Sequence, residues 1–120
     1  MALILTVDDS TTMRQMVNFT LSSAGHTVDE ASNADEALAL AGKRNFELII
    51  ADVNMPGRNG IELVRELRKL PGCKFTPILM LTTESEPELK QAGKEAGATG
   101  WIVKPFNPDT LLSVLKRVLP

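Results

Sequence analysis

Leu48-Ile49-Ile50-Ala51-Asp52-Val53-Asn54-Met55-Pro56-Gly57 is an apolar run that ends in one carboxylate and then a turn. The run from Leu48 to Ala51 is too short for a helix and contains β-branched residues, which favours a buried strand. Residues 54–60, Asn-Met-Pro-Gly-Arg-Asn-Gly, are typical of a loop. We therefore expect Asp52 where the strand meets the loop. This position leaves two interpretations open: a polar residue that only ends the strand, or a reactive carboxylate.

The composition predicts one domain over residues 1–120, because 120 residues can bury a continuous core without disulfides or a structural metal. With 13 basic and 15 acidic residues, the chain lacks the basic field that nucleic-acid binding requires. The single Cys73 cannot form an intramolecular disulfide, which fits a reducing compartment. No apolar stretch approaches the roughly 20 residues that span a bilayer. We therefore expect a cytoplasmic protein that binds neither nucleic acid nor membrane.

Short apolar runs alternate with amphipathic segments along the whole chain. Strands are expected at residues 3–7, 27–31, 48–51, 77–81 and 99–103. Helices are expected from a cap at residues 10–12 to Gly25, from Asn33 to Gly42, from Gly60 to Pro71, from Pro87 to Ala96, and from Asn107 to the end of the chain. Five strands alternating with five helices imply parallel strands joined by helical crossovers. The expected fold is a doubly wound α/β domain.

Two helices carry more specific expectations. In the first, Met16 follows the apolar spacing of Val17 and Leu21 and is expected in the core, because methionine commonly fills gaps there. The helix at 87–96 has few apolar residues on one face and is interrupted by Gly93. We expect it to be the least stable element.

Polar residues stand at the carboxyl ends of four of the five expected strands. They are Asp8, Asp9, Asp52, Thr82 and Lys104. In a parallel sheet these ends lie on one edge, outside which ligands bind in folds of this class. Four unrelated strand ends are the alternative explanation, but one shared site accounts for all five residues together.

The expected cluster has the chemistry of phosphoryl transfer. Three neighbouring carboxylates repel one another unless a cation compensates them, and oxygen ligands of this kind suit Mg²⁺. A carboxylate beside Mg²⁺, an ammonium group and a hydroxyl can attack a phosphoryl group, because positive charge neutralises the transferring oxygens. We therefore expect Asp52 to be phosphorylated, with Lys104 and Thr82 stabilising the phosphoryl group.

Four segments together resemble the receiver domain of two-component response regulators, in particular the single-domain chemotaxis receivers of the CheY type. They are Val7-Asp8-Asp9-Ser10, Ala51-Asp52-Val53-Asn54-Met55-Pro56-Gly57, Leu81-Thr82-Thr83 and Val103-Lys104-Pro105-Phe106. The resemblance covers the whole chain. It implies the flavodoxin-like receiver fold, with strand order 2-1-3-4-5 and no output domain.

The resemblance also implies a metal site and a phosphoacceptor. Asp52 would accept the phosphoryl group. One Mg²⁺ ion would be held by Asp8, Asp9, Asp52 and the backbone carbonyl of Asn54. Asn54 and Glu84 would also tune dephosphorylation by contacting or screening the attacking water, with solvated loop residues as the alternative.

At the other end of the site, the resemblance implies that Thr82 and Lys104 bind the phosphoryl group and that Lys104-Pro105 is a cis peptide bond. Trp101 stands three residues before Lys104, where the family more often has Tyr, Phe or His. The aromatic residue at this position turns inward when the threonine moves towards the phosphate. The larger indole of Trp101 leaves simple core packing as the alternative to a switch.

In functional terms, the resemblance implies a signalling phosphoacceptor rather than an enzyme: a monomeric chemotaxis messenger. Its partners would be a histidine kinase of the CheA type, the flagellar motor switch protein and, as a further candidate, a phosphatase. The helix at 87–96, the Trp101 strand and the last helix would form the output surface. The alternative within the family is a stand-alone receiver in another phosphorelay.

Two other classes of protein fit less well. A Mg²⁺-dependent phosphatase with an aspartate nucleophile needs a second acid two residues later, where this chain has Asn54. A flavodoxin-like flavin carrier needs a phosphate-binding loop after the first strand. There, Asp8 and Asp9 would repel the phosphate of the flavin.

Overall fold

A computed structural model describes residues 2–53, 59–82, 87–104 and 107–119. Five parallel strands form one sheet in the order β2-β1-β3-β4-β5. They are β1 (Leu3–Val7), β2 (Thr27–Ala31), β3 (Leu48–Asp52), β4 (Ile78–Thr82) and β5 (Gly100–Val103). This arrangement confirms the doubly wound α/β fold and the strand order 2-1-3-4-5.

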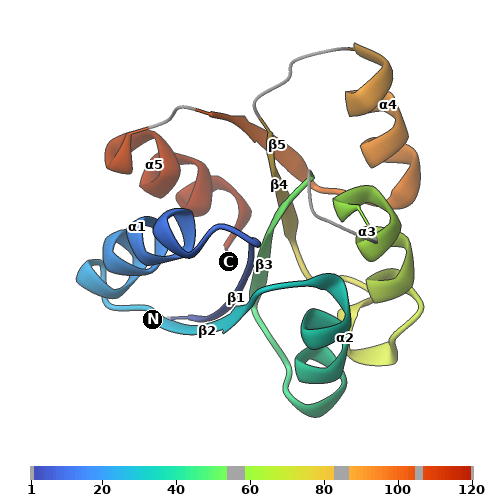
Figure 1. Cartoon of the computed structure of the whole chain (residues 1–120), viewed down its shortest axis with the longest axis horizontal. Coiled ribbons are helices and arrows are strands. Elements are labelled where there is room, and N and C mark those ends of the chain that lie inside the picture. Colours follow the sequence, from blue (N-terminus) through green and yellow to red (C-terminus); the bar gives the residue numbers. More distant parts are fainter. Residues whose placement is uncertain (1, 54–58, 83–86, 105–106, 120) are drawn as a thin grey trace.

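Helices cover both faces of the sheet (Figure 1). They are α1 (Thr11–Ser23), α2 (Ala34–Lys43), α3 (Gly60–Arg68), α4 (Pro87–Ala96) and α5 (Pro108–Val118), with a 3-10 turn, η1 (Pro71–Cys73), after α3. Helices α1 and α5 pack on one face, and α2, α3 and α4 pack on the other. Every strand and helix lies within three residues of its expected bounds. Over the described ranges, no helix combines the length and apolar character needed to cross a bilayer.

Side-chain caps determine where four of these helices begin. Ser10, Asn33, Asn59 and Asn107 each accept a hydrogen bond from the backbone N–H three residues later. A cap of this kind stabilises a helix by about 0.5–2 kcal/mol. The Ser10 cap matters most for the site, because it starts α1 immediately after Asp8 and Asp9.

The core consists of two layers, one on each face of the sheet. The layer under α2, α3 and α4 contains the strand residues Leu5, Val7, Ile49, Ala51, Ile78 and Met80. The layer under α1 and α5 contains Ile4, Leu48, Ile50, Leu79, Leu81 and Ile102. Strand β3 lies at the centre of the sheet and is buried at all five positions. The burial of Asp52 follows from this central place.

One expectation about a helix face was wrong. Met16 is 40% exposed, although it was expected in the core. Helix α1 buries only a narrow stripe around Val17 and Leu21, and Met16 lies beside that stripe. Leu63 of α3, for which the sequence analysis made no prediction, is fully buried. Helix α3 packs against α2 and α4 as well as the sheet, so more than one stripe of its surface is covered.

Candidate functional site

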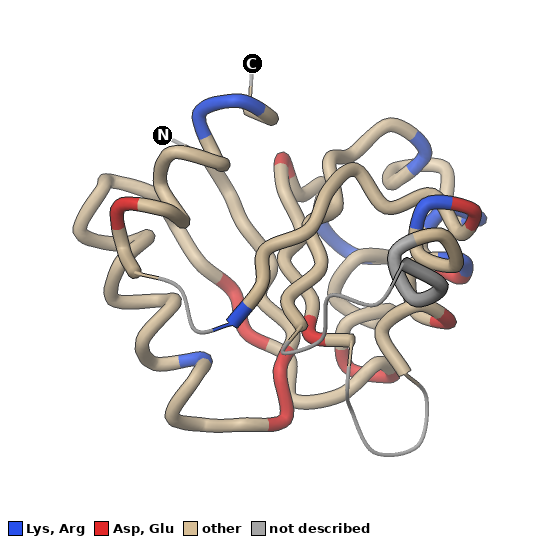
Figure 2. Tube along the Cα trace, turned by 90° about the horizontal axis from the view of Figure 1, so that it is seen from above, with Lys and Arg blue, Asp and Glu red and all other residues tan. Residues whose placement is uncertain are grey.

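The strand register brings the expected site residues together at the carboxyl edge of the sheet. It places Asp8, the residue after β1, level with Asp52 of β3, and Thr82 of β4 one residue further along. Lys104 follows the residue of β5 that pairs with Thr82, and its backbone N–H donates to the Thr82 carbonyl oxygen at 2.7 Å. Figure 2 shows acidic segments gathered on this side of the sheet with a basic segment beside them. The predicted convergence of these residues is therefore present in the structure.

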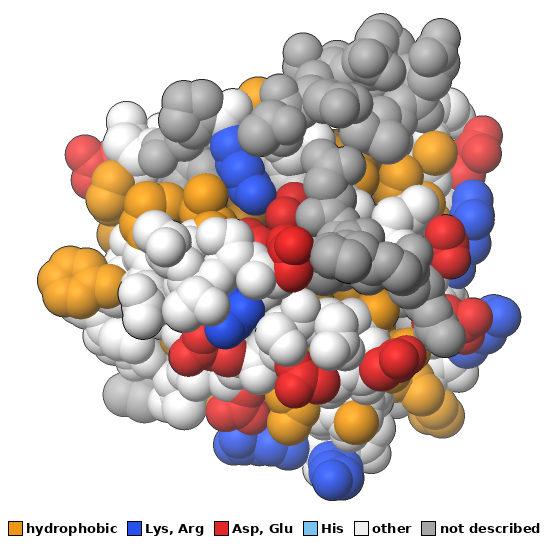
Figure 3. All heavy atoms as spheres, in the orientation of Figure 1, with side chains coloured by type: hydrophobic (Ala, Val, Ile, Leu, Met, Phe, Trp, Pro, Cys, Tyr) orange, Lys and Arg blue, Asp and Glu red, His pale blue; other side chains and the backbone are white. Residues whose placement is uncertain are grey.

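Three carboxylates form the centre of the site. Asp8, Asp9 and Asp52 each offer an oxygen atom, and the three atoms lie within 4.8 Å of one another. Asp8 and Asp52 are only 3% and 4% exposed, whereas Asp9 is exposed. Carboxylate side chains are visible at the surface in the middle of the face seen in Figure 3. The cluster is therefore buried on the Asp8 and Asp52 side and reachable from solvent on the Asp9 side.

The hydrogen bonding of Asp8 indicates that the carboxylate cluster suits a cation. Its Oδ1 accepts a hydrogen bond from the backbone N–H of Ser10 at 2.9 Å. Its buried Oδ2 has no hydrogen-bond partner among the described atoms. A buried acceptor left in this state costs free energy, and three clustered carboxylate oxygens are the hard donors that Mg²⁺ prefers. A divalent cation bound to Asp8, Asp9 and Asp52 would satisfy this oxygen.

Lys104 supplies the positive charge of the site. Its Nζ lies 3.3 Å from Asp52 Oδ2 and 3.6 Å from Asp8 Oδ2, and its side chain is 13% exposed. One ammonium group thus faces two buried carboxylates. With Asp9 included, the cluster keeps a net negative charge that attracts a cation.

Burial raises the pKa of the Asp8 carboxyl above its ordinary value. Repulsion from Asp52 and Asp9 raises this pKa further, while the Ser10 N–H and Lys104 act in the opposite direction. The ionised form of Asp8 is therefore disfavoured in the folded protein by its surroundings. A bound cation would remove that penalty.

Gly60 is a residue of the site that the sequence interpretation missed. Its N–H donates to the Val53 carbonyl oxygen at 2.8 Å and closes the loop after β3. A Cβ atom at this position would collide with the Asp52 carbonyl oxygen and lie 2.8 Å from the Cα of Val53. Only glycine permits so close an approach to the backbone of Asp52. The sequence signal was the glycine directly after the cap Asn59.

Trp101 lies on β5, half-buried, on the side covered by α4. Its ring packs against Gly93: a Cβ added there would lie 3.1 Å from Trp101 Cη2 and closer still to Cζ2. The structure thus places Trp101 beneath α4, while Lys104, three residues later, lies among the carboxylates. This position joins the expected output helix to the strand that carries Lys104.

Three of the residues implied by the family resemblance lie outside the described residues: Asn54, Glu84 and Pro105. The Asn54 carbonyl ligand, the tuning roles of Asn54 and Glu84, and the cis Lys104-Pro105 bond therefore stay predictions.

Comparison with known proteins identifies the family. The response regulator receiver domain matches residues 4–116. This chain belongs to that family. The solved structure of the chemotaxis response regulator CheY4 of Vibrio cholerae is 59% identical, covers 99% of both chains and superposes with a TM-score of 0.97. The receiver fold and the resemblance to CheY-type receivers are thereby confirmed.

Two other relatives show the breadth of the receiver family. The transcriptional regulatory protein ResD of Bacillus subtilis is 40% identical over 116 residues, which cover 97% of this chain and 47% of ResD. The chain thus spans about half the length of that relative. The receiver domain of the sensor histidine kinase PA1611 of Pseudomonas aeruginosa is 25% identical, with a TM-score of 0.90 and coverage of 98% of this chain and 96% of that one. Its structure has a magnesium ion coordinated in the active site cleft.

Proposed function

We propose that this receiver domain is a phosphorylation-dependent signalling protein that accepts a phosphoryl group on Asp52 from a histidine kinase. The observation that carries the proposal is the Asp52 carboxylate, buried at the carboxyl edge of the sheet with the Lys104 ammonium 3.3 Å away and two further carboxylates beside it. A residue that only ends a strand needs neither a lysine nor an acidic pair beside it, so this arrangement favours a reactive carboxylate.

The transfer uses a carboxylate oxygen of Asp52 as the nucleophile. The bond from this oxygen to phosphorus forms as the phosphorus–nitrogen bond of the donor phosphohistidine breaks, and the leaving imidazole nitrogen keeps the electron pair and takes up a proton. Lys104 neutralises charge on the phosphoryl oxygens. Thr82, fully buried one residue beyond the level of Asp52 in the sheet, supplies a hydroxyl for the same group.

The acidic cluster suits one Mg²⁺ ion held by Asp8, Asp9 and Asp52. When bound, the ion supplies positive charge to the carboxylates and to the phosphoryl oxygens. The oxygen-only ligand set, the Asp8 Oδ2 atom that accepts no hydrogen bond from the described residues and the magnesium ion in the PA1611 receiver domain support this assignment. The protein's own chemistry is then confined to gaining and losing its phosphoryl group, without a separate substrate.

The partner that reads the phosphorylated state is proposed to be the flagellar motor switch protein, with a kinase of the CheA type upstream. The 59% identity to CheY4, a chemotaxis response regulator, supports this choice. A surface formed by α4, β5 and α5 is the candidate contact, because Trp101 joins α4 to the strand next to the site. The relation to ResD supports the second candidate, a receiver in another phosphorelay.

The phosphoacceptor is tested with a small phosphodonor and Mg²⁺, followed by the intact mass of the protein. Wild type is expected to gain the mass of one phosphoryl group, in a linkage that hydroxylamine or alkali cleaves. Asp52→Asn should gain nothing, while Asp109→Asn, which alters an exposed acid of α5, should behave as wild type. An adduct of equal yield in Asp52→Asn would refute the assignment.

The downstream partner is tested with the purified motor switch protein. Its affinity for the chain should rise when a phosphoryl mimic occupies Asp52 and stay low in Asp52→Asn. Binding that ignores the mimic would favour the other phosphorelay.

A further inference from the structure

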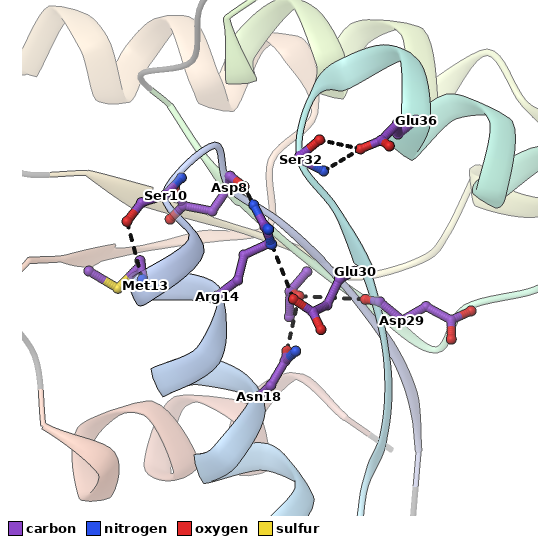
Figure 4. A network of polar contacts seen from close by, with 10 residues as sticks. Asp8, Ser10, Met13, Arg14, Asn18, Asp29, Glu30, Ser32 and Glu36 are labelled. Carbon is purple, nitrogen blue, oxygen red and sulfur yellow. Dashed lines mark hydrogen bonds and ion pairs between the residues drawn. The ribbon is translucent and has the colours of Figure 1, made fainter.

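Arg14, in the first turn of α1, holds the turn that carries the acidic pair (Figure 4). Its Nη1 donates to the Asp8 carbonyl oxygen at 2.6 Å, and its backbone N–H donates to the Ser10 carbonyl oxygen at 3.0 Å. These carbonyl groups stand immediately before and after Asp9 in the chain. The guanidinium therefore holds the backbone before Asp9, whereas the bond to Ser10 is a main-chain bond of α1 that any residue with a backbone N–H would make at position 14.

Glu30 of β2 orients the guanidinium of Arg14. Arg14 Nε donates to Glu30 Oε1 at 3.1 Å, and the arginine side chain is only 15% exposed. The planar guanidinium presents several donors in a fixed geometry, so it can bond Glu30 and the Asp8 carbonyl group at once. Strand β2 also holds Asp8 directly, because the Asp8 N–H donates to the Ala31 carbonyl oxygen at 3.1 Å. The turn is thus fastened to α1 and to β2.

Asp8 has one polar atom that these hydrogen bonds do not use. Its N–H, its carbonyl oxygen and its Oδ1 are bonded by Ala31, Arg14 and Ser10 respectively. Its Oδ2 remains, and this is the atom that lies 3.6 Å from Lys104 Nζ within the carboxylate cluster. The network therefore directs that oxygen into the site.

We propose that Arg14 is a positioning residue for the divalent-cation site: it holds the Asp8-Asp9 turn in the arrangement that binds the ion. The inference rests on the proposed function, because it takes Asp8 and Asp9 as ligands of Mg²⁺. It concerns a contact with the backbone of a ligand, in contrast to the side-chain roles proposed for Lys104 and Thr82. Partners of this kind, one step removed from the metal, commonly change metal affinity by about 10–100-fold.

The direction in which Mg²⁺ affinity changes when Arg14 is removed distinguishes a positioning role from a purely electrostatic one. A positive charge near three carboxylates weakens cation binding, so Arg14 acting only through its charge would make Mg²⁺ bind more tightly once the arginine is removed. Loss of a positioning contact has the opposite effect, because the freed turn must be ordered when the ion binds.

The experiment is a calorimetric Mg²⁺ titration of wild type, Arg14→Met, Arg14→Lys and Arg44→Met. Arg44 pairs with Asp29, the neighbour of Glu30 on β2, so Arg44→Met removes the same charge from a strand ion pair without a contact to Asp8. Arg14→Met is expected to bind Mg²⁺ about tenfold more weakly. Arg14→Lys should lie between it and wild type, and Arg44→Met should match wild type.

A second measurement reports on the turn without the metal. The Ser10 amide bonds Asp8 Oδ1, so its hydrogen exchange should be faster in Arg14→Met than in wild type and unchanged in Arg44→Met. Urea unfolding without Mg²⁺ establishes that each variant is folded. If Arg14→Met does not fold, the test uses Arg14→Lys, which should also bind Mg²⁺ more weakly than wild type.

The possible outcomes are distinct. Failure of wild type to bind Mg²⁺ overturns the proposed metal site together with this inference. If wild type binds the ion, equal or tighter binding by Arg14→Met overturns the role of Arg14 alone. An equal loss of affinity in Arg44→Met does the same, because it would show that weaker binding is a general effect on the fold and not a consequence of the contact with Asp8.

Discussion

The indole ring of Trp101 lies directly against Gly93 of α4. A Cβ atom at Gly93 would lie 3.1 and 3.2 Å from two ring atoms and still closer to a third. Such separations are shorter than ordinary van der Waals contact. The ring therefore occupies the space that any other residue at position 93 would use, and α4 approaches β5 because that residue is glycine.

Gly93→Ala tests this packing. Alanine favours a helix by about 1 kcal/mol over glycine, yet here its methyl group would overlap the ring of Trp101. We expect a net loss of about 1–3 kcal/mol in the free energy of unfolding, measured with urea, and a shift of Trp101 fluorescence. The matched control is Gly42→Ala in α2, where the added methyl group meets no atom within 4 Å. A Gly93→Ala protein as stable as Gly42→Ala would contradict the packing.

The sequence predicts the positions of the strands but not the contact between Gly93 and Trp101. The periodicity of apolar residues located every strand and helix. Because the strands are parallel, their carboxyl ends lie on one edge of the sheet. The residues at those ends therefore had to meet there: Asp8, Asp52, Thr82 and Lys104. Gly93 could only be interpreted as a weak point of its helix, because its contact with Trp101 depends on how α4 lies on the sheet.

The same reasoning applies to the contacts of Arg14 with Asp8 and Glu30. Arg14 is the single charged residue of α1 (Thr11–Ser23), yet nothing in its spacing shows that its side chain bends back towards the preceding turn. Met16 was misplaced for a related reason: the number of helices packed beside α1 decides how wide a stripe of its surface is buried.

Asp8→Asn should stabilise the protein in the absence of Mg²⁺. The pKa of Asp8 is raised by burial, so its ionised form costs folding free energy at neutral pH, and the neutral amide removes this cost. Well below the ordinary pKa of aspartate, Asp8 is protonated in both the folded and unfolded states, so the advantage of the variant should vanish there. Urea unfolding at about pH 7 and about pH 3 measures both effects.

The same variant should lose the stabilisation that Mg²⁺ gives. Wild type is expected to gain free energy of unfolding as the Mg²⁺ concentration rises, because a ligand that binds only the folded state stabilises it. Asp8→Asn should gain much less. Equal gains in the two proteins would remove Asp8 from the metal site.

Lys104→Met removes the ammonium group that faces Asp8 and Asp52. Two buried carboxylates are then left without compensation, and we expect the free energy of unfolding without Mg²⁺ to fall by roughly 1–3 kcal/mol. The loss is smaller than for a fully enclosed pair, because Asp9 opens the cluster to water. Mg²⁺ should bind more tightly, since a competing positive charge is gone, while phosphorylation of Asp52 should slow.

The control for Lys104→Met is Lys69→Met, which breaks a largely exposed pair with Glu66 at 3.7 Å. Exposed pairs contribute about 0–1 kcal/mol, so this variant should remain close to wild type in stability and in phosphorylation rate. Weaker Mg²⁺ binding in Lys104→Met would show that the lysine does not compete with the ion.

Arg68 holds the carboxyl end of α4 to the body of the protein. Its Nε and Nη2 donate to the Gly97 carbonyl oxygen at 3.0 and 2.8 Å, and its Nη1 donates to the carbonyl oxygens of Cys73 and Thr76, each at 2.7 Å. Its acceptors thus lie on the turn after α4 and on the segment before β4. This anchor stabilises the end of a helix that has little apolar surface of its own.

Arg68→Lys should lower the free energy of unfolding by about 1–3 kcal/mol. One ammonium group cannot reproduce the several donors of the guanidinium, so carbonyl groups are left without a hydrogen bond. The Ala98 amide, which bonds the Gly93 carbonyl oxygen at 2.9 Å, should exchange faster with solvent than in wild type. Arg65→Lys, an exposed change one turn earlier on α3, serves as the control and should alter neither quantity. Faster exchange spread evenly over all five helices would instead indicate a general loss of stability, since the anchor acts on α4 through Gly97.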